Sequence, residues 1–137
     1  MPCREHAAQL CARQDEFSQL NTRVFIISFG TLPALHKWMN ETCASFDVLF
    51  DPDRNVYRAY QLERSLLRSW SPRTIWTVAK LLLAGRKWIS KQDDSDTSQL
   101  GGDFIVDKNG ILRLVHPSHD PADRPPVDDL LKVIEKL

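Results

Sequence analysis

Apolar positions in the first fifty residues predict a helix, then two strands with a second helix between them. From Glu5 to Leu20 the apolar residues recur at helical spacing, which predicts an amphipathic helix. The runs 24–29 and 47–50 are almost continuously apolar, a pattern typical of strands that are buried on both faces of a sheet. Gly30-Thr31 opens the helix that separates them.

Two further helices are predicted in the second half of the chain. Ser71 suits the N-cap position and Pro72 the first helical position, so a helix is expected to begin here and to run to Ile89. Apolar residues at helical spacing from Val127 to Leu137 predict an amphipathic helix at the end of the chain.

The apolar runs 104–106 and 111–115 predict a β-hairpin. Asp107-Lys108-Asn109-Gly110 connects them, and we expect Asn109 and Gly110 to supply positive φ angles. The earlier alternation of helix and strand implies parallel strands with crossover helices, to which the hairpin adds an antiparallel edge. The sequence therefore predicts an α/β fold, with one domain over residues 1–137 and a mixed sheet covered by helices on both faces.

Charge and composition exclude several classes of protein. Eighteen basic residues balance eighteen acidic ones among 137, which removes the net attraction to nucleic acids and to membrane surfaces. We therefore expect neither a nucleic-acid nor a membrane partner. The most apolar run, Val78–Ala84, contains a lysine and is too short to span a bilayer. With no secretory signal and three cysteines that cannot all pair, we expect a cytoplasmic protein.

Cys3 is the candidate catalytic residue. It stands at the start of the first helix after Pro2, and Arg4 adds a positive charge beside it. Backbone N–H groups and the helix dipole favour an anion at this position, and hence the thiolate form. Peroxide reduction and thiol–disulfide exchange both require a thiolate. The position alone leaves open the alternative of an ordinary terminal cysteine.

The other two cysteines are predicted to be structural. Cys11 lies eight residues further along the same helix, about 12 Å from Cys3 at the rise of an α-helix, so the two cannot pair without unwinding it. It also falls on the apolar face, where a cysteine is usually a small core residue. Cys43 lies near the end of the second helix, and its distance from Cys3 is the one that the sequence leaves open.

No metal or cofactor site is expected. His116 and His119 share a proline-rich loop but have no third ligand at suitable spacing. Asp93–Asp96 is similar to a calcium-binding loop but lacks its central glycine and terminal glutamate. The sequence also contains no glycine-rich phosphate loop and no serine nucleophile elbow.

Several short motifs are similar to one family in their order and spacing. Pro2-Cys3-Arg4-Glu5-His6 resembles the end of a Cys-Pro-x-Cys-Arg-Glu-His segment that opens a first helix. Later segments of the same family resemble Asp51–Arg54, Gln99–Asp107 and His116–Asp120. On these motifs the chain is identified as a member of the peroxiredoxin-like branch of the AhpC/TSA antioxidant family, truncated at its N-terminus.

The resemblance implies a thioredoxin-like three-layer sandwich whose first strand is missing, and the activity of a thiol-dependent oxidoreductase. In such an enzyme a thiolate attacks a peroxide or a disulfide, and thioredoxin or glutathione supplies the electrons. Cys3 matches the second cysteine of the motif, which resembles the resolving partner, because the leading cysteine would fall before Met1. In this chain Cys3 would have to attack, and Cys43 or an external thiol would resolve.

The chain also departs from the family at the hairpin. Mainstream peroxiredoxins place an arginine just before the hairpin strand to hold the peroxide, and thioredoxins place a cis-proline there. The matching stretch, Leu100-Gly101-Gly102, has neither. The alternative function is therefore a non-catalytic thioredoxin-like module that binds a partner through the surface exposed by the missing strand.

Overall fold

The computed structural model describes residues 2–42, 45–62, 64–65, 71–85 and 98–137. Within them the chain forms six helices and four strands, so the mixed α/β composition predicted from the sequence is confirmed. In chain order these are α1 (Pro2–Ala12), α2 (Gln14–Gln19), β1 (Phe25–Ser28), α3 (Leu32–Thr42), β2 (Asp47–Phe50), α4 (Asn55–Ala59), α6 (Pro72–Leu83), β3 (Gly102–Val106), β4 (Leu112–Pro117) and α7 (Val127–Ile134).

Among the described residues the strands form two separate sheets, where the sequence predicted one mixed sheet. β1 and β2 pair in parallel, and β3 and β4 pair antiparallel. On the β2 side the Ser28 carbonyl accepts a hydrogen bond from the Asp51 N–H at 2.7 Å. The carbonyl of the preceding residue, Ile27, faces the opposite edge, because neighbouring residues of a strand alternate. There it accepts a hydrogen bond from the Tyr57 hydroxyl at 2.9 Å, so a side chain caps this edge.

The strands are less buried than their apolar sequences predicted. Phe25 of β1 and Leu49 and Phe50 of β2 are exposed, as are Val106 and Val115 of the hairpin. Burial on both faces requires neighbouring strands and covering helices, and a two-stranded sheet has few of either. The prediction of fully buried strands is therefore wrong for β1 and β2.

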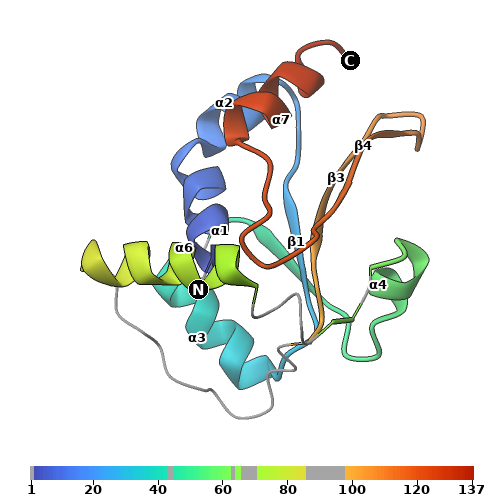
Figure 1. The fold of residues 1–137 in the computed structure, drawn as a ribbon. Coiled ribbons are helices and arrows are strands. Elements are labelled where there is room, and N and C mark those ends of the chain that lie inside the picture. The colour runs from blue at the N-terminus through green and yellow to red at the C-terminus, as the bar shows by residue number, and fades with distance from the viewer. Residues whose placement is uncertain (1, 43–44, 63, 66–70, 86–97) are drawn as a thin grey trace.

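The first predicted helix is divided in two at Arg13. This residue has φ of −114° and ψ of 22°, outside the helical range, and it separates α1 from α2. Its guanidinium forms ion pairs with Glu16 in α2 and with Asp128 in α7. The break turns α2 away from α1, so that α2 lies beside α7 (Figure 1).

The hairpin turn is built differently from the prediction. Gly110 has φ of 80°, but Asn109 is not among the residues with positive φ. Instead, the Asp107 Oδ1 atom accepts hydrogen bonds from the backbone N–H groups of Asn109 at 2.8 Å and Ile111 at 3.0 Å. Five residues, 107–111, connect β3 to β4, so one glycine and an aspartate cap replace the two positive φ angles of a two-residue turn.

The hydrophobic core lies between α2 and α7. Phe17 of α2 is buried against one face of α7, formed by Val127, Leu131 and Ile134. The partly buried residues around this cluster are Leu10, Leu20, Val24 and Ile105. Because Ile105 belongs to β3, the core ties the hairpin to the two helices. It thereby fixes the start of α7 and the end of the loop that precedes it.

α6 begins as predicted. The Ser71 Oγ atom caps its N-terminus by accepting a hydrogen bond from the Thr74 N–H at 3.2 Å, and Pro72 is the first helical residue. The helix ends at Leu83, and the predicted continuation to Ile89 lies outside the described residues.

In the part of the chain that the structure describes, no helix has the length and apolar character needed to cross a membrane.

We expect Leu131→Ala to lower the free energy of unfolding by about 2–5 kcal/mol, because the side chain is 4% exposed and its loss leaves a cavity in the core. Urea denaturation followed by circular dichroism measures this. Leu137→Ala removes the same atoms from a side chain that is 56% exposed, and should change stability by less than about 0.5 kcal/mol. Equal losses in the two variants would contradict the described core.

Candidate functional site

Cys3 lies in the first turn of α1, and α1 contacts both α3 and α6. Its side chain is exposed, and it is the free cysteine among the described residues. The Sγ atom lies 3.9 Å from the carbonyl oxygen of Pro121. Pro121 belongs to residues 118–126, the β4–α7 loop, which passes the start of α1. The candidate from the sequence therefore lies where this helix meets this loop.

Arg124 of the β4–α7 loop lies beside the thiol. Its Nη2 atom is 3.4 Å from the Cys3 Sγ, and its Nη1 atom is 3.0 Å from Asp103 Oδ2. The arginine side chain is only 14% exposed. A guanidinium stays charged throughout the physiological range, so a fixed, largely desolvated cation adjoins Cys3.

Asp103 connects this arginine to α1. Its second carboxylate oxygen, Oδ1, is 3.0 Å from Nε2 of His6, which is buried and lies one helical turn after Cys3. Since an ionised carboxylate only accepts hydrogen bonds, the His6 Nε2 atom is the donor. The thiol, the guanidinium, the carboxylate and the imidazole thus form one continuous network between α1, β3 and the β4–α7 loop.

Electrostatics keep the central ion pair charged. Burial alone raises the pKa of the Asp103 carboxyl, but the hydrogen bond from His6 and the charge of Arg124 outweigh it and hold that pKa below its ordinary value. Burial likewise lowers the pKa of Arg124, but negative charge on Cys3 and Asp103 outweighs it, and that pKa is raised. Both groups therefore remain ionised at neutral pH.

Gly101 leaves room for the guanidinium. A Cβ atom at this position would lie 2.6 Å from Arg124 Nη2, closer than real Cβ contacts come. The next residue, Gly102, is also confined, because its Cβ would lie 2.8 Å from the His116 carbonyl oxygen across the hairpin. The backbone of the neighbouring strand therefore requires glycine at position 102, whereas a side chain at position 101 would push the Arg124 guanidinium aside.

The β4–α7 loop is held in place from two sides. Asp120 is almost completely buried, and its Oδ1 atom accepts hydrogen bonds from the Ala122 N–H at 2.9 Å and from the Thr74 hydroxyl of α6 at 3.3 Å. The Ser118 N–H donates to the Gly101 carbonyl at 2.9 Å. These contacts fix the backbone of the loop and so hold the Arg124 side chain close to Cys3.

Tyr57 stays neutral near this network. Tyr57 belongs to α4. The start of this helix is fixed because the two carboxylate oxygens of Asp51 accept hydrogen bonds from the backbone N–H groups of Asn55, at 2.9 Å, and Val56, at 2.8 Å. Burial, and next the negative charge of Cys3, raise the pKa of Tyr57 to about 12. Its phenol is therefore a hydrogen-bond donor at neutral pH.

A family model described as AhpC/TSA antioxidant enzyme matches residues 9–120 of this sequence. The chain belongs to the AhpC/TSA antioxidant enzyme family. No curated protein matches it. Membership of this family, whose members are generally peroxidase-type oxidoreductases, implies a thioredoxin-like fold and thiol-based redox chemistry. Cys3 and Arg124 both lie outside the matched residues, so the AhpC/TSA match itself assigns no role to either.

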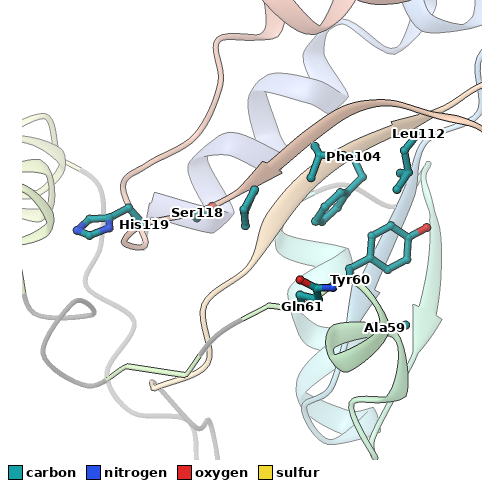
Figure 2. Close-up of a pocket in the computed structure, with 9 residues that line it drawn as sticks. Ala59, Tyr60, Gln61, Phe104, Leu112, Ser118 and His119 are labelled. Carbon is teal, nitrogen blue, oxygen red and sulfur yellow. The ribbon is translucent and has the colours of Figure 1, made fainter.

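A pocket of about 600 Å³ lies on the opposite face of the hairpin from this network. Figure 2 shows Phe104 and Leu112 on one side of it and Tyr60 on the other. Phe104 and Tyr60 meet edge to face, with ring centroids 4.5 Å apart. Successive residues of a strand point to opposite faces, so Phe104 faces α4 while Asp103 faces α1. Neither Cys3 nor Arg124 lines this pocket.

The remaining candidates from the sequence lie outside the network. Cys11 is half-buried, its Sγ is 3.3 Å from the Ser45 hydroxyl, and it is disulfide-bonded, so the prediction of a small core thiol is wrong. Cys43 lies outside the described residues. His116 Nε2 is 3.5 Å from Asp123 Oδ1.

No cluster of three or more potential metal ligands occurs in the described part of the chain, where His119 is exposed. Asp93–Asp96 lies outside that part.

The sequence patterns point to neither Arg124 nor Asp103 as a site residue. They lie 21 residues apart, and Arg124 lies 121 residues from Cys3, so no local motif joins them. The one available sign is a charged pair, Asp123-Arg124, directly before Pro125-Pro126. Prolines fix the backbone and can hold a preceding side chain in place.

We expect Asp103→Asn to lower the free energy of unfolding at pH 7 by about 2–4 kcal/mol, because it leaves the largely buried Arg124 without its anion. The folded-state pKa of Asp103 is depressed, so its contribution is complete above its unfolded value of about 4 and is lost as the pH falls through the lower folded value. Urea denaturation should therefore show a wild-type advantage at pH 7 that shrinks below about pH 4. Asp129→Asn, in an exposed pair with Lys132, is the control. A pH-independent difference would contradict the assigned ion pair.

We expect Gly101→Ala to displace the Arg124 guanidinium and to slow alkylation of Cys3 by iodoacetamide about threefold to tenfold. Mass spectrometry of the Cys3 peptide gives the rate. Gly30→Ala is the matched control, since a Cβ there meets nothing within 4 Å. An unchanged rate in Gly101→Ala would show that the close approach of Arg124 does not govern the thiol.

Proposed function

We propose that this chain is a thiol-dependent antioxidant oxidoreductase that reduces peroxides, or exchanges disulfides, through Cys3. Its membership of the AhpC/TSA family supports thiol-based redox chemistry. The observation that supports Cys3 as the reacting group is the 3.4 Å approach of Arg124 Nη2 to its Sγ. The arginine fulfils the requirement for a cation that Leu100-Gly101-Gly102 does not meet in the sequence.

In the first step the Cys3 thiolate attacks one oxygen of the peroxide. An S–O bond forms and the O–O bond breaks, and the departing oxygen takes the electron pair and a proton to leave as water or an alcohol. Cys3 is thereby oxidised to the sulfenic acid, and the peroxide is reduced. The Arg124 guanidinium stabilises the thiolate before the attack and the negative charge on the oxygen during it.

In the second step an external thiol, from thioredoxin or glutathione, attacks the Cys3 sulfenic acid. An S–S bond forms and water leaves, and a second thiol of the reductant then breaks this mixed disulfide and restores Cys3. Among the described residues Cys11 is disulfide-bonded and Cys3 is the free cysteine, which supports an external thiol for resolution; Cys43, the other candidate, lies outside the described residues.

We expect the purified chain to consume hydrogen peroxide in the presence of dithiothreitol, and Cys3→Ser to abolish this consumption because it removes the nucleophile. Arg124→Met keeps much of the side-chain volume but removes the charge, and should lower the rate about 10- to 100-fold. The measurement is peroxide concentration against time.

Arg23→Met is the matched control, because Arg23 is a largely exposed arginine paired with Asp47, and its rate should equal that of the wild type. Undiminished turnover in Cys3→Ser would remove Cys3 from the mechanism. Absence of turnover in the wild type with both hydrogen peroxide and a disulfide substrate would favour the non-catalytic binding module.

A further inference from the structure

The charges of this chain are segregated along its sequence. Residues 64–92 contain seven of the eighteen basic residues and none of the eighteen acidic ones. The net charge of zero is therefore the sum of a segment with a charge of about +7 and a remainder of the chain with a charge of about −7. α6 occupies the middle of this segment and is the part of it that the structure describes as a helix.

α6 presents large apolar side chains to solvent. Leu83 is 88% exposed and Trp76 64%, and Ile75 and Leu82 are exposed as well. At about 100° per residue these four positions fall within one arc of about 120° on the helix surface. Thr74 is buried on the opposite side, where its hydroxyl contacts Asp120. Val78 and Leu81 are half-buried on the same side as Thr74, so α6 has an apolar face turned outward in addition to the side by which it is anchored.

Basic side chains border this apolar face. Lys80 and Arg73 are exposed and lie along one edge of the arc, and the Lys80 Nζ atom stacks over the Trp76 ring at 5.4 Å from its centroid. Arg73 also lies 3.6 Å from Asp123, so Lys80 is the less engaged of the two cations. An apolar stripe that contains tryptophan and is edged by basic residues is typical of helices that lie in the interface of a bilayer.

We propose that α6 binds the surface of an anionic lipid bilayer, with Ile75, Trp76, Leu82 and Leu83 entering the headgroup region and Lys80 contacting lipid phosphates. Aliphatic side chains make no favourable contact with the phosphates of a nucleic acid. A nucleic-acid partner would therefore not explain why Leu82 and Leu83 are exposed. A bilayer satisfies both the apolar face and the excess of positive charge. The expectation of no membrane partner rests on net charge, which averages over this segregation.

Vesicle sedimentation of the full chain tests the proposal. We expect it to pellet with vesicles of phosphatidylcholine and phosphatidylserine in a ratio of about three to one, and to bind pure phosphatidylcholine at least about tenfold more weakly. Lys80→Ala should weaken binding to the mixed vesicles about fivefold, the effect of one surface charge. Leu83→Ser and Trp76→Ser should each weaken it about tenfold by removing apolar insertion.

Two controls match these variants. Lys108→Ala removes an exposed lysine from the hairpin turn, and Leu137→Ser removes an exposed leucine from the end of the chain, so neither should change binding. Far-UV circular dichroism shows whether each variant keeps the fold, and Lys80→Ala remains informative if an apolar variant does not.

Three outcomes overturn the proposal. One is no sedimentation with the mixed vesicles, and another is equal affinity for the two vesicle compositions. The third is a dimer that Leu83→Ser abolishes while vesicles bind nothing, which assigns the face to a second copy of the chain. None of these readouts depends on peroxide turnover, so they test membrane binding independently of the proposed function.

Discussion

A guanidinium that is removed from water needs an anion beside it, and Asp103 is the anion beside Arg124. This pair joins β3 to the β4–α7 loop, and through His6 it also reaches α1, the helix that carries Cys3. The energetic reason for the arrangement is the cost of leaving either charge unpaired in a partly desolvated position. Once the pair forms, the second nitrogen of the guanidinium, Nη2, lies 3.4 Å from the Cys3 Sγ atom, which is the contact on which the proposed function depends.

The surrounding backbone is shaped to admit that arginine. Gly101 provides the space for the guanidinium, and the Ser118 N–H binds the Gly101 carbonyl, so the loop and the strand are fixed to each other at the point of closest approach. The buried Asp120 carboxylate ties the same loop to α6. The loop thus brings a cation to Cys3, whereas mainstream peroxiredoxins place an arginine just before the hairpin strand, where this chain has Leu100-Gly101-Gly102. The AhpC/TSA match ends at residue 120, so Arg124 lies beyond the residues that the family model matches.

The charge and exposure of α6 show that the average composition of a chain does not describe its surface. The formal charge is zero, but seven of the eighteen basic residues lie in residues 64–92, which contain no acidic residue. Trp76 and Leu83 could equally have been core residues on their hydrophobicity alone. Only the folded chain shows that these two side chains are exposed, which is the observation behind the proposed contact with a bilayer.

The sequence by itself determined the local elements and the candidate thiol. Helical spacing located α3 and α7, and Ser71-Pro72 located the start of α6. The placement of Cys3 at the start of a helix followed from its neighbours. All of these features depend on residues within a few positions of one another. The tertiary structure decided what the strands pair with and what lies beside the thiol. The break at Arg13, the Tyr57 hydroxyl on the edge of β1 and the approach of Arg124 to Cys3 each join residues far apart in sequence. Which charges and backbone groups become partners depends on how the whole chain folds, and no local pattern encodes which partner that will be.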